Sequence, residues 1–194
     1  MKSRRELNIE ATRGAILATA RRHFAREGFS ASEIGRIAKD ARVTTGAVYH
    51  HFANKKDLFL AVAEQLEGEI LATAAKADGK DPLARMRAGF ELLIDVCAAP
   101  DIQRIIFIEA PQVIGPEAWR EIELEYAFGA LRATLDDLRE AGAIKPYPLE
   151  LVARLLLALL HETSAELARE KRAAETRARI SALVTDVFAA LLSP

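Results

Sequence analysis

The stretch ARVTTGAVYHHFANKKDL, residues 41–58, decides the fold predicted for this chain. It places Gly46 two residues after Thr44, a threonine suited to cap a helix, and it continues into polar and aromatic side chains at residues 49–52. A helix that only packs in a core gains nothing from either feature. A helix pressed against a charged surface uses both, because glycine permits close approach and a helix N-terminus attracts anions.

The residues around this stretch predict a helix-turn-helix. We expect a first helix over 10–27 that ends at Gly28, and a second over 33–40 that is capped by Ser32. A third helix begins at Thr44 and ends by residue 54, so that only residues 41–43 separate it from the second. Two helices joined by so short a turn, the second of them short and exposed, are typical of the DNA-binding motif in which the second helix enters the major groove.

Within this motif, position along the third helix suggests the role of each side chain. Thr45 lies in the first turn and is assigned to base edges, while Gly46 lets the backbone approach DNA at a cost of about 1 kcal/mol in helix propensity. Phosphate contacts are assigned to Tyr49, His51 and Lys55. The full set of predicted DNA-binding residues is Arg42, Thr44, Thr45, Gly46, Tyr49, His50, His51 and Lys55.

The charge distribution favours a polyanion-binding head, although a chance cluster of solvated charge explains it equally well. Residues 1–56 contain twelve Lys and Arg against five Asp and Glu, whereas the whole chain has a net charge of −1. One cysteine, Cys97, excludes an internal disulfide framework and predicts a cytoplasmic protein, nucleoid-associated when bound to DNA. The basic N-terminus lacks the apolar core of a secretory signal, and the apolar run 151–160 is too short and too charged to span a bilayer.

The rest of the chain also predicts helices. They are expected over 55–71 (capped by Asn54), 83–98, 101–109 (interrupted by Pro111), 116 to Gly142, 149–170 and 174–192. The fold class is therefore all-α. The helix over 149–170 is apolar on nearly every face, and the helix over 174–192 carries apolar residues at i, i+3, i+4 and i+7. Both helices therefore suit a four-helix bundle formed by two chains across a two-fold axis. The alternative is that these apolar residues pack within one chain. The predicted dimer residues are Leu155, Leu159, Ile180, Leu183, Val184, Val187, Phe188 and Leu191.

Large apolar groups with a few polar ones between these helices suit a small-molecule pocket, although core packing explains each aromatic residue nearly as well. The candidate pocket residues are Phe90, Ile94, Phe107, Trp119, Tyr126 and His161. His161 and Glu162 begin like a zinc HExxH signature, but residue 165 is alanine, so no metal is predicted and His161 either lines the cavity or packs in the core. No cofactor is expected, and without a nucleophile–base signature or a phosphate-binding glycine loop an enzyme has little support.

From Thr12 to about Leu60, the chain resembles the N-terminal DNA-binding domain of the TetR family of bacterial transcriptional repressors. The resemblance rests on Ile16, Ala20, Phe24, Gly28, Ile37, Ala38, the run 43–49, His51, Phe52 and Lys55. Arg42 stands where the family usually has a glycine, His50 where an arginine or another polar residue is common, and Ala53 where a proline is frequent. A left-handed backbone at Arg42 should cost about 1 kcal/mol, so we expect the turn to survive.

The resemblance implies a homodimer with conserved heads and divergent C-terminal helical domains that bind an effector. We therefore expect a DNA-binding domain over 1–56, joined by a connecting helix to an effector-binding and dimerisation domain over 57–194. The predicted function is ligand-responsive regulation, with a palindromic operator on double-stranded DNA and release by a small apolar or aromatic effector. The alternative is a helical protein-interaction or scaffold module whose helix-turn-helix is only structural.

Overall fold

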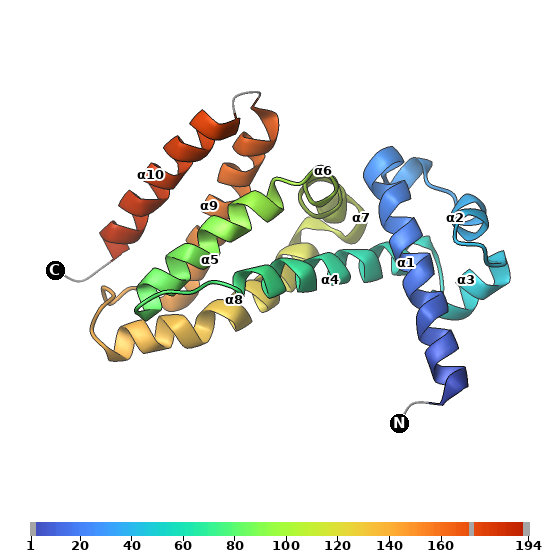
Figure 1. Cartoon of the computed structure of the whole chain (residues 1–194), viewed down its shortest axis with the longest axis horizontal. Helices are drawn as coiled ribbons and strands as arrows, with labels where there is room; N and C mark the ends of the chain where they lie inside the picture. The colour runs from blue at the N-terminus through green and yellow to red at the C-terminus, as the bar shows by residue number, and fades with distance from the viewer. Residues whose placement is uncertain (1–2, 171–172, 192–194) are drawn as a thin grey trace. The chain divides into compact units, whose positions relative to one another are not determined.

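The computed structural model describes residues 3–170 and 173–191, which form helices and connecting turns without a β-strand (Figure 1). The chain divides into two compact units, Met1–Leu66 with Pro100–Trp119, and Glu67–Ala99 with Arg120–Pro194. Helices α4 (Lys55–Ala74) and α8 (Pro116–Glu140) contribute to both units. The division differs from the functional boundary expected at residues 56 and 57, because it groups residues 100–119 with the head.

The first unit begins with the three helices of the head, α1 (Arg4–Ala31), α2 (Ile34–Asp40) and α3 (Thr45–His51). Ser3 and Glu6 form a capping box at the start of α1, six residues before the expected helix. Gly28 interrupts α1 with φ 82° and ψ 169°, close to the predicted stop. Apolar residues at helical spacing form the core of the unit: Ile16, Ala20, Phe24, Ile37, Val48, Phe52 and Phe59 are all buried.

The predicted cap of α2 by Ser32 is wrong. The Ser32 hydroxyl donates a hydrogen bond to the Gly28 carbonyl at 2.7 Å, and Glu33 occupies the N-cap position of α2 without a side-chain hydrogen bond. The positive φ of Gly28 leaves the carbonyls at the end of α1 without helical partners, and the nearby hydroxyl satisfies one of them. Ser32 therefore closes α1 instead of opening α2.

The segment after residue 99 is continuously helical, so the interruption expected at Pro111 is also wrong. It consists of α6 (Pro100–Ile102), the π-helix η1 (Gln103–Glu109) and α7 (Ala110–Ile114), and it ends at Gly115 with φ 113°. A proline lacks the N–H for an α-helical bond and its ring crowds the carbonyl four residues earlier. The wider π-helical turn before Pro111 relieves this conflict, so the proline lies in the first turn of α7 without ending the helix.

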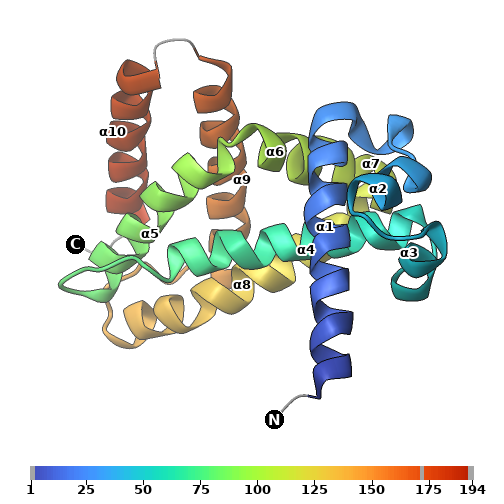
Figure 2. The ribbon, with the colours of Figure 1, turned by 45° about the vertical axis from the view of Figure 1, so that its right-hand side comes forward.

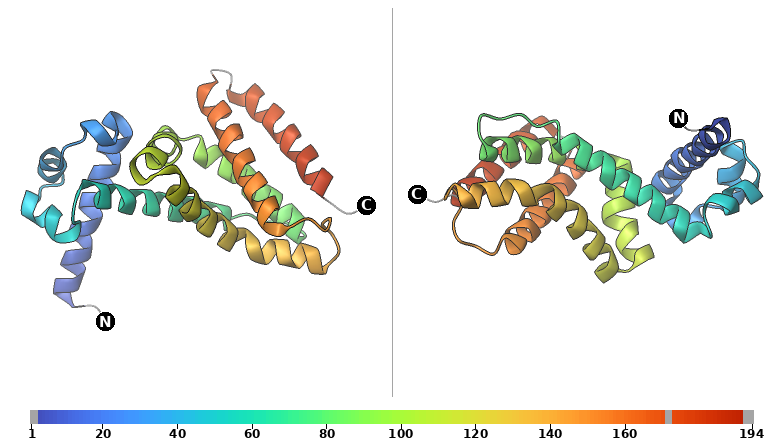
Figure 3. Two further views of the ribbon diagram at one scale, coloured as in Figure 1. Left: turned by 180° about the vertical axis from the view of Figure 1, so that it is seen from behind. Right: turned by 90° about the horizontal axis from the view of Figure 1, so that it is seen from below.

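The second unit contains α5 (Pro82–Cys97), α9 (Leu149–Arg169) and α10 (Ala173–Leu191), together with the later parts of α4 and α8. Asp81 caps α5 with its side chain on the Ala84 N–H, and Pro82 takes the first turn as predicted. Helix α9 packs against both α5 and α10, as Figure 2 and the rear view in Figure 3 show. The last residue of the expected final helix, 192, lies outside the described residues.

The apolar run in α9 is part of a packed helix. Its buried residues include Val152, Leu156 and Leu160, which recur every four positions. Within the described part of the chain, no helix is both long and apolar enough to cross a membrane.

Candidate DNA interface and ligand-binding residues

The third helix begins as predicted. Thr44 is its N-cap, and the Thr44 hydroxyl oxygen accepts a hydrogen bond from the Ala47 N–H at 3.0 Å. Thr45 and Gly46 follow in the first turn and are exposed. A Cβ atom built on Gly46 would meet only the Thr44 hydroxyl oxygen, at 3.8 Å, so nothing among the described residues requires a glycine there. The space over Gly46 is open to an external partner.

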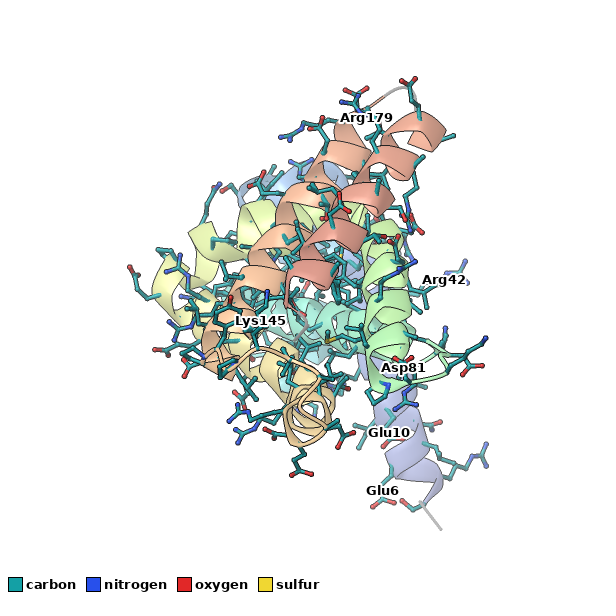
Figure 4. All side chains as sticks on the ribbon, turned by 90° about the vertical axis from the view of Figure 1, so that its left-hand side faces the viewer. Glu6, Glu10, Arg42, Asp81, Lys145 and Arg179 are labelled. Atoms are coloured by element: carbon teal, nitrogen blue, oxygen red, sulfur yellow. The ribbon has the colours of Figure 1, made fainter. Side chains whose placement is uncertain are left out.

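The turn between α2 and α3 has the left-handed residue that the motif needs. Arg42 has φ 58°, and no other non-glycine residue among those described has a positive φ. The backbone accepts this strain because the next N–H, of Val43, bonds to the Ala38 carbonyl at 3.0 Å and closes α2. The Arg42 side chain is exposed and extends away from the ribbon (Figure 4). Its guanidinium is therefore free to reach a phosphate.

The polar and aromatic cluster lies at the end of α3. Tyr49 and His50 are exposed, and the rings of His50 and His51 meet edge to face at 5.5 Å. Burial lowers the pKa of His51, and the positive charges of His50 and Arg13 lower it further. The position of Arg13 beside this cluster was not predicted from the sequence. It comes from α1 and its guanidinium lies 5.2 Å from the Phe52 ring centre, which brings one more cation to the end of α3.

Lys55 has partners within the chain. Its ammonium donates to the carbonyls of Phe29 at 2.9 Å, Ser32 at 3.0 Å and Ser30 at 3.3 Å, and it lies 4.5 Å from the Phe29 ring centre. These contacts join the start of α4 to the end of α1. The phosphate contact assigned to Lys55 stays a prediction, but the structure gives this side chain a role in holding the head together.

The end of α1 is also bound by η1, within the same unit. The Glu109 carboxylate accepts a hydrogen bond from the Phe29 N–H at 3.1 Å, and Arg104 donates to the Arg26 carbonyl at 3.0 Å. Arg104 and Glu109 pair with each other at 3.6 Å. A Cβ atom on Gly28 would lie 2.4 Å from Glu109 Oε1, so this contact requires glycine there. We call the set Gly28, Phe29, Arg104 and Glu109 the η1 latch.

The six candidate pocket residues are distributed over both units. Phe107 and Trp119 belong to the first unit; Trp119 is 1% exposed, and its indole N–H has no hydrogen-bond partner among the described residues. In the second unit, Phe90 packs edge to face on Phe188 with ring centres 5.4 Å apart, Ile94 is buried and Tyr126 is half-buried. A common pocket for all six stays a prediction.

His161 has a buried acidic neighbour. His161 Nε2 lies 3.3 Å from Glu123 Oε1, and the histidine side chain is 30% exposed. Glu123 of α8 and Glu67 of α4 are both buried, and neither was singled out from the sequence. A signal existed: Glu67 lies four residues after Ala63 and three before Ile70, on the apolar stripe of α4.

Burial raises the pKa of Glu67 to about 7, and the charge of Glu123 adds to the shift. Burial likewise raises the pKa of the Cys97 thiol to about 12, with smaller contributions from the same two carboxylates. Cys97 is thus a buried thiol of low reactivity. No group of three or more His, Cys, Asp or Glu in the described ranges is arranged to hold a metal ion.

Three of the predicted dimer residues are buried within the chain itself. Ile180, Val184 and Phe188 are 6%, 0% and 2% exposed within one chain, so little of their surface remains for a partner. These three residues of α10 therefore pack within one chain, the alternative to a dimer contact. Leu155 and Leu183 are 59% and 51% exposed, and Leu151, which was missed, is 51% exposed. Leu159, Val187 and Leu191 are half-buried.

Comparison with known proteins agrees with this geometry. Residues 16–62 match the family model "Bacterial regulatory proteins, tetR family", and residues 83–191 match "Tetracyclin repressor-like, C-terminal domain". The Transposon Tn10 TetC protein of Escherichia coli is 30% identical over 156 residues, which cover 80% of this chain and 79% of that protein.

Other relatives agree over different lengths. The HTH-type transcriptional regulator AcrR of Shigella flexneri is 41% identical over 100 residues, or 50% of this chain and 45% of that protein. The crystal structure of a TetR-family transcriptional regulator from Pectobacterium atrosepticum is 26% identical with a TM-score of 0.73, covering 100% of this chain and 99% of that one. The chain therefore belongs to the TetR family, whose members are DNA-binding transcriptional regulators and not enzymes.

Proposed function

We propose that this protein is a repressor that binds a palindromic operator as a homodimer and leaves it when a small apolar or aromatic effector binds the C-terminal domain. It acts on chromosomal DNA, in the cytoplasm and at the nucleoid. TetR-family regulators bind operators, typically as dimers and under the control of small molecules. Three features of this chain support the proposal, one for each of its parts: DNA binding, dimerisation and control by an effector.

The observation that carries the proposal is the open first turn of α3. Thr45 and Gly46 are exposed there, and no contact with the part of the chain that the structure describes explains the glycine. A glycine without a side chain lets a helix backbone approach the floor of the major groove, and the free N–H groups of the first turn suit a phosphate. Thr45 is the side chain that we assign to base edges.

The exposed leucines of α9 and α10 support a homodimer. Leu151 and Leu155 are four residues apart on α9, and Leu183 is exposed on α10. Two such helices from each of two chains form a four-helix bundle across a two-fold axis, in which each leucine meets the equivalent surface of its partner. A dimer of this kind presents two α3 helices to successive major grooves, roughly 34–36 Å apart or a multiple of that distance.

The η1 latch supports control from outside the helix-turn-helix. Residues 100–119 pack with the head, and Arg104 and Glu109 bind the backbone near the end of α1. An effector that favours another position of η1 changes the α1–α2 turn and with it the presentation of α3. Coupling between two sites typically amounts to about 1–3 kcal/mol, and by reciprocity operator DNA weakens effector binding by the same factor.

Selection of bound fragments from random DNA with the purified protein tests the proposal. We expect a palindromic consensus, bound with an affinity that falls steeply between roughly 50 and 200 mM salt because phosphate contacts release counterions. Thr45→Ala should change the preference at one base pair in each half-site, whereas a control substitution on α4, Thr73→Ala at a half-buried position, should not. An absence of saturable DNA binding would favour a scaffold module and refute the proposal.

A further inference from the structure

A buried histidine lies between two carboxylates where the first two helices of the head meet. His23 of α1 is 3% exposed. Its Nε2 atom lies 2.8 Å from Oδ2 of Asp40, the last residue of α2. Its Nδ1 atom lies 3.8 Å from Oε2 of Glu27, one helical turn further along α1. Each ring nitrogen therefore faces one acidic side chain.

Only one of these two contacts is a hydrogen bond. Neither His23 Nδ1 nor Glu27 Oε2 has a hydrogen-bond partner among the described residues, although both atoms are buried. Buried polar atoms are almost always hydrogen-bonded, because the bonds that they lose to water have to be replaced. The two atoms are 3.8 Å apart, which is too long for a hydrogen bond but requires only a small movement to form one.

The number of protons on the ring decides whether that bond can form. A neutral imidazole carries one N–H, so when Nε2 donates to Asp40, Nδ1 presents a lone pair to the Glu27 carboxylate. The other tautomer places a lone pair 2.8 Å from Asp40 Oδ2 instead. The imidazolium form of His23 has a donor at both nitrogens, so it alone suits both carboxylates.

The surrounding groups keep both carboxylates ionised. The hydrogen bond with His23 is the main reason that the pKa of Asp40 is lowered, and the charges of His23 and of two basic residues of α2 lower it further. Hydrogen bonding by Arg26 is the main cause of the lowered pKa of Glu27. Arg26 and Arg36 both bind Oε1 of Glu27, which leaves Oε2 for His23.

The other helices around α1 place their charged side chains at other residues. Within the described ranges, His23 forms ion pairs with Glu27 and Asp40 alone. Asp101 of α6 pairs with Arg21, His51 of α3 lies near Arg13, and Arg104, Glu109 and Lys55 bind the backbone of residues 25–32.

We propose that His23 is a positioning residue whose protonated ring clamps α2 to α1, so that the presentation of α3 to DNA depends on pH. Asp40 ends α2, and the left-handed Arg42 follows two residues later, so the bond from His23 fixes the point from which α3 starts. When the ring is protonated, Nδ1–H donates to Glu27 Oε2 and the clamp closes on both carboxylates. Loss of that proton turns one attraction into repulsion and loosens the clamp.

The sign of the pH dependence follows from the charges. A cation between two carboxylates stabilises the folded head, so its contribution is present at low pH and is lost as the pH rises and the ring loses its proton. Because histidine changes charge between about pH 5 and pH 8, we expect tighter operator binding near the lower end of this range. This consequence rests on the proposed function, since it requires an operator.

The operator affinity of the full-length protein, measured against His23→Gln at fixed salt, tests the clamp. Glutamine keeps a hydrogen-bond donor but cannot become a cation. We expect the ratio of wild-type to variant affinity to fall by roughly tenfold or more between about pH 6 and pH 8. His50 and His51 are present in both proteins, so their own effect on DNA binding cancels in this ratio.

Variants of the neighbouring residues separate the clamp from helix packing in general. Glu27→Gln keeps the shape of the side chain, removes its charge and should abolish most of the pH dependence. Arg36→Gln is the matched control, because it breaks the other ion pair between α1 and α2, of 2.9 Å, and should keep the pH dependence even where it weakens binding. Asp40→Asn, at a side chain that is 53% exposed, should flatten the profile and gives the same test if circular dichroism shows that His23→Gln does not fold.

Two measurements without DNA test the clamp independently of the proposed function. In urea unfolding, the stabilisation of the wild type relative to His23→Gln should shrink between about pH 6 and pH 8. Nitrogen chemical shifts of the imidazole rings report the protons directly, and the His23 signals are those lost in the variant. They should show a proton on both ring nitrogens at about pH 6.

Three results would overturn the clamp: a neutral His23 ring at about pH 6, an affinity ratio that does not change with pH, or equal loss of the pH dependence in Glu27→Gln and Arg36→Gln. Each of them leaves the proposed function standing as long as the protein selects an operator. A failure to bind any operator, with the ring and the unfolding behaving as expected, refutes the proposed function and leaves the clamp.

Discussion

Replacing Gly28 with alanine tests the η1 latch most directly. Gly28 has φ 82° and ψ 169°, a region of backbone conformation that is almost restricted to glycine. An alanine held there should cost about 1–3 kcal/mol in strain. The added Cβ would also lie 2.4 Å from Glu109 Oε1 and 2.8 Å from Arg104 Nη2, so at least one of these side chains must move.

The second part of the cost comes from the contact that is displaced. Glu109 accepts the Phe29 N–H at 3.1 Å, and a hydrogen bond to a charged group contributes about 1.5–3 kcal/mol. Together the two effects predict that Gly28→Ala lowers the free energy of unfolding by about 2.5–6 kcal/mol, a large part of the stability of a domain. Urea unfolding, followed by circular dichroism at one fixed protein concentration, measures this change.

Gly14→Ala is the matched control, because Gly14 is also in α1 and a Cβ atom there meets nothing within 4 Å. It should stabilise the protein by up to about 1 kcal/mol through helix propensity. In a Glu109→Ala background, Gly28→Ala should cost only its backbone strain, so the two substitutions should be less than additive. Equal unfolding midpoints for Gly28→Ala and Gly14→Ala, or full additivity with Glu109→Ala, would refute the latch.

Three further predictions concern the head and the dimer. Lys55→Ala should weaken binding to all DNA sequences by a similar factor and flatten the salt slope by about one unit. It should also lower the free energy of unfolding by about 1–3 kcal/mol, since three carbonyls lose their donor. The control Lys56→Ala, at an exposed position, should leave this free energy unchanged, and urea titrations of both variants measure the difference. Thr45→Ala, in a binding-site selection, should alter preference at one base pair per half-site and keep the salt slope; identical behaviour of the lysine and threonine variants would end the division of roles. The pair Leu155→Asp and Leu183→Asp should yield folded monomers by sedimentation, because charges enter an apolar seam, and a persistent dimer would show that the interface lies elsewhere.

Much of the head could be predicted from sequence, because its signals are local. Helix caps, the Gly28 stop and the spacing of apolar residues act over a few positions, so Thr44 was predicted correctly as a cap. The left-handed turn at Arg42 was expected as well, since the geometry of a short turn fixes the backbone whatever the side chain. The prediction for Ser32 was wrong because this residue can either close α1 or cap α2. The positive φ of Gly28 favours the first role, since it leaves a carbonyl at the end of α1 for the Ser32 hydroxyl.

Less of the chain after the head could be predicted, because its features depend on partners distant in sequence. The stripe on α10 was found, but a stripe does not say whether it faces the same chain or another one, and Val184 proved to face inward. Glu67 was missed because a single glutamate in an amphipathic helix is unremarkable until its burial is known. The π-helix before Pro111 was missed because proline rules assume α-helical hydrogen bonding.

The end of α1 brings these observations together within the first unit. Regular helices leave their last carbonyls to water or to a local cap, yet here Arg104 takes the carbonyls of residues 25 and 26 and Lys55 takes those of residues 29, 30 and 32. One cation comes from η1 and the other from the start of α4, directly after the helix-turn-helix. The turn that orients α2 and α3 is thus held by side chains from outside the motif. We therefore expect that a shift of η1 would alter the support of the DNA-binding helices without unfolding any of them. Gly28 is the residue that permits this arrangement, since any side chain there would occupy the place of Glu109.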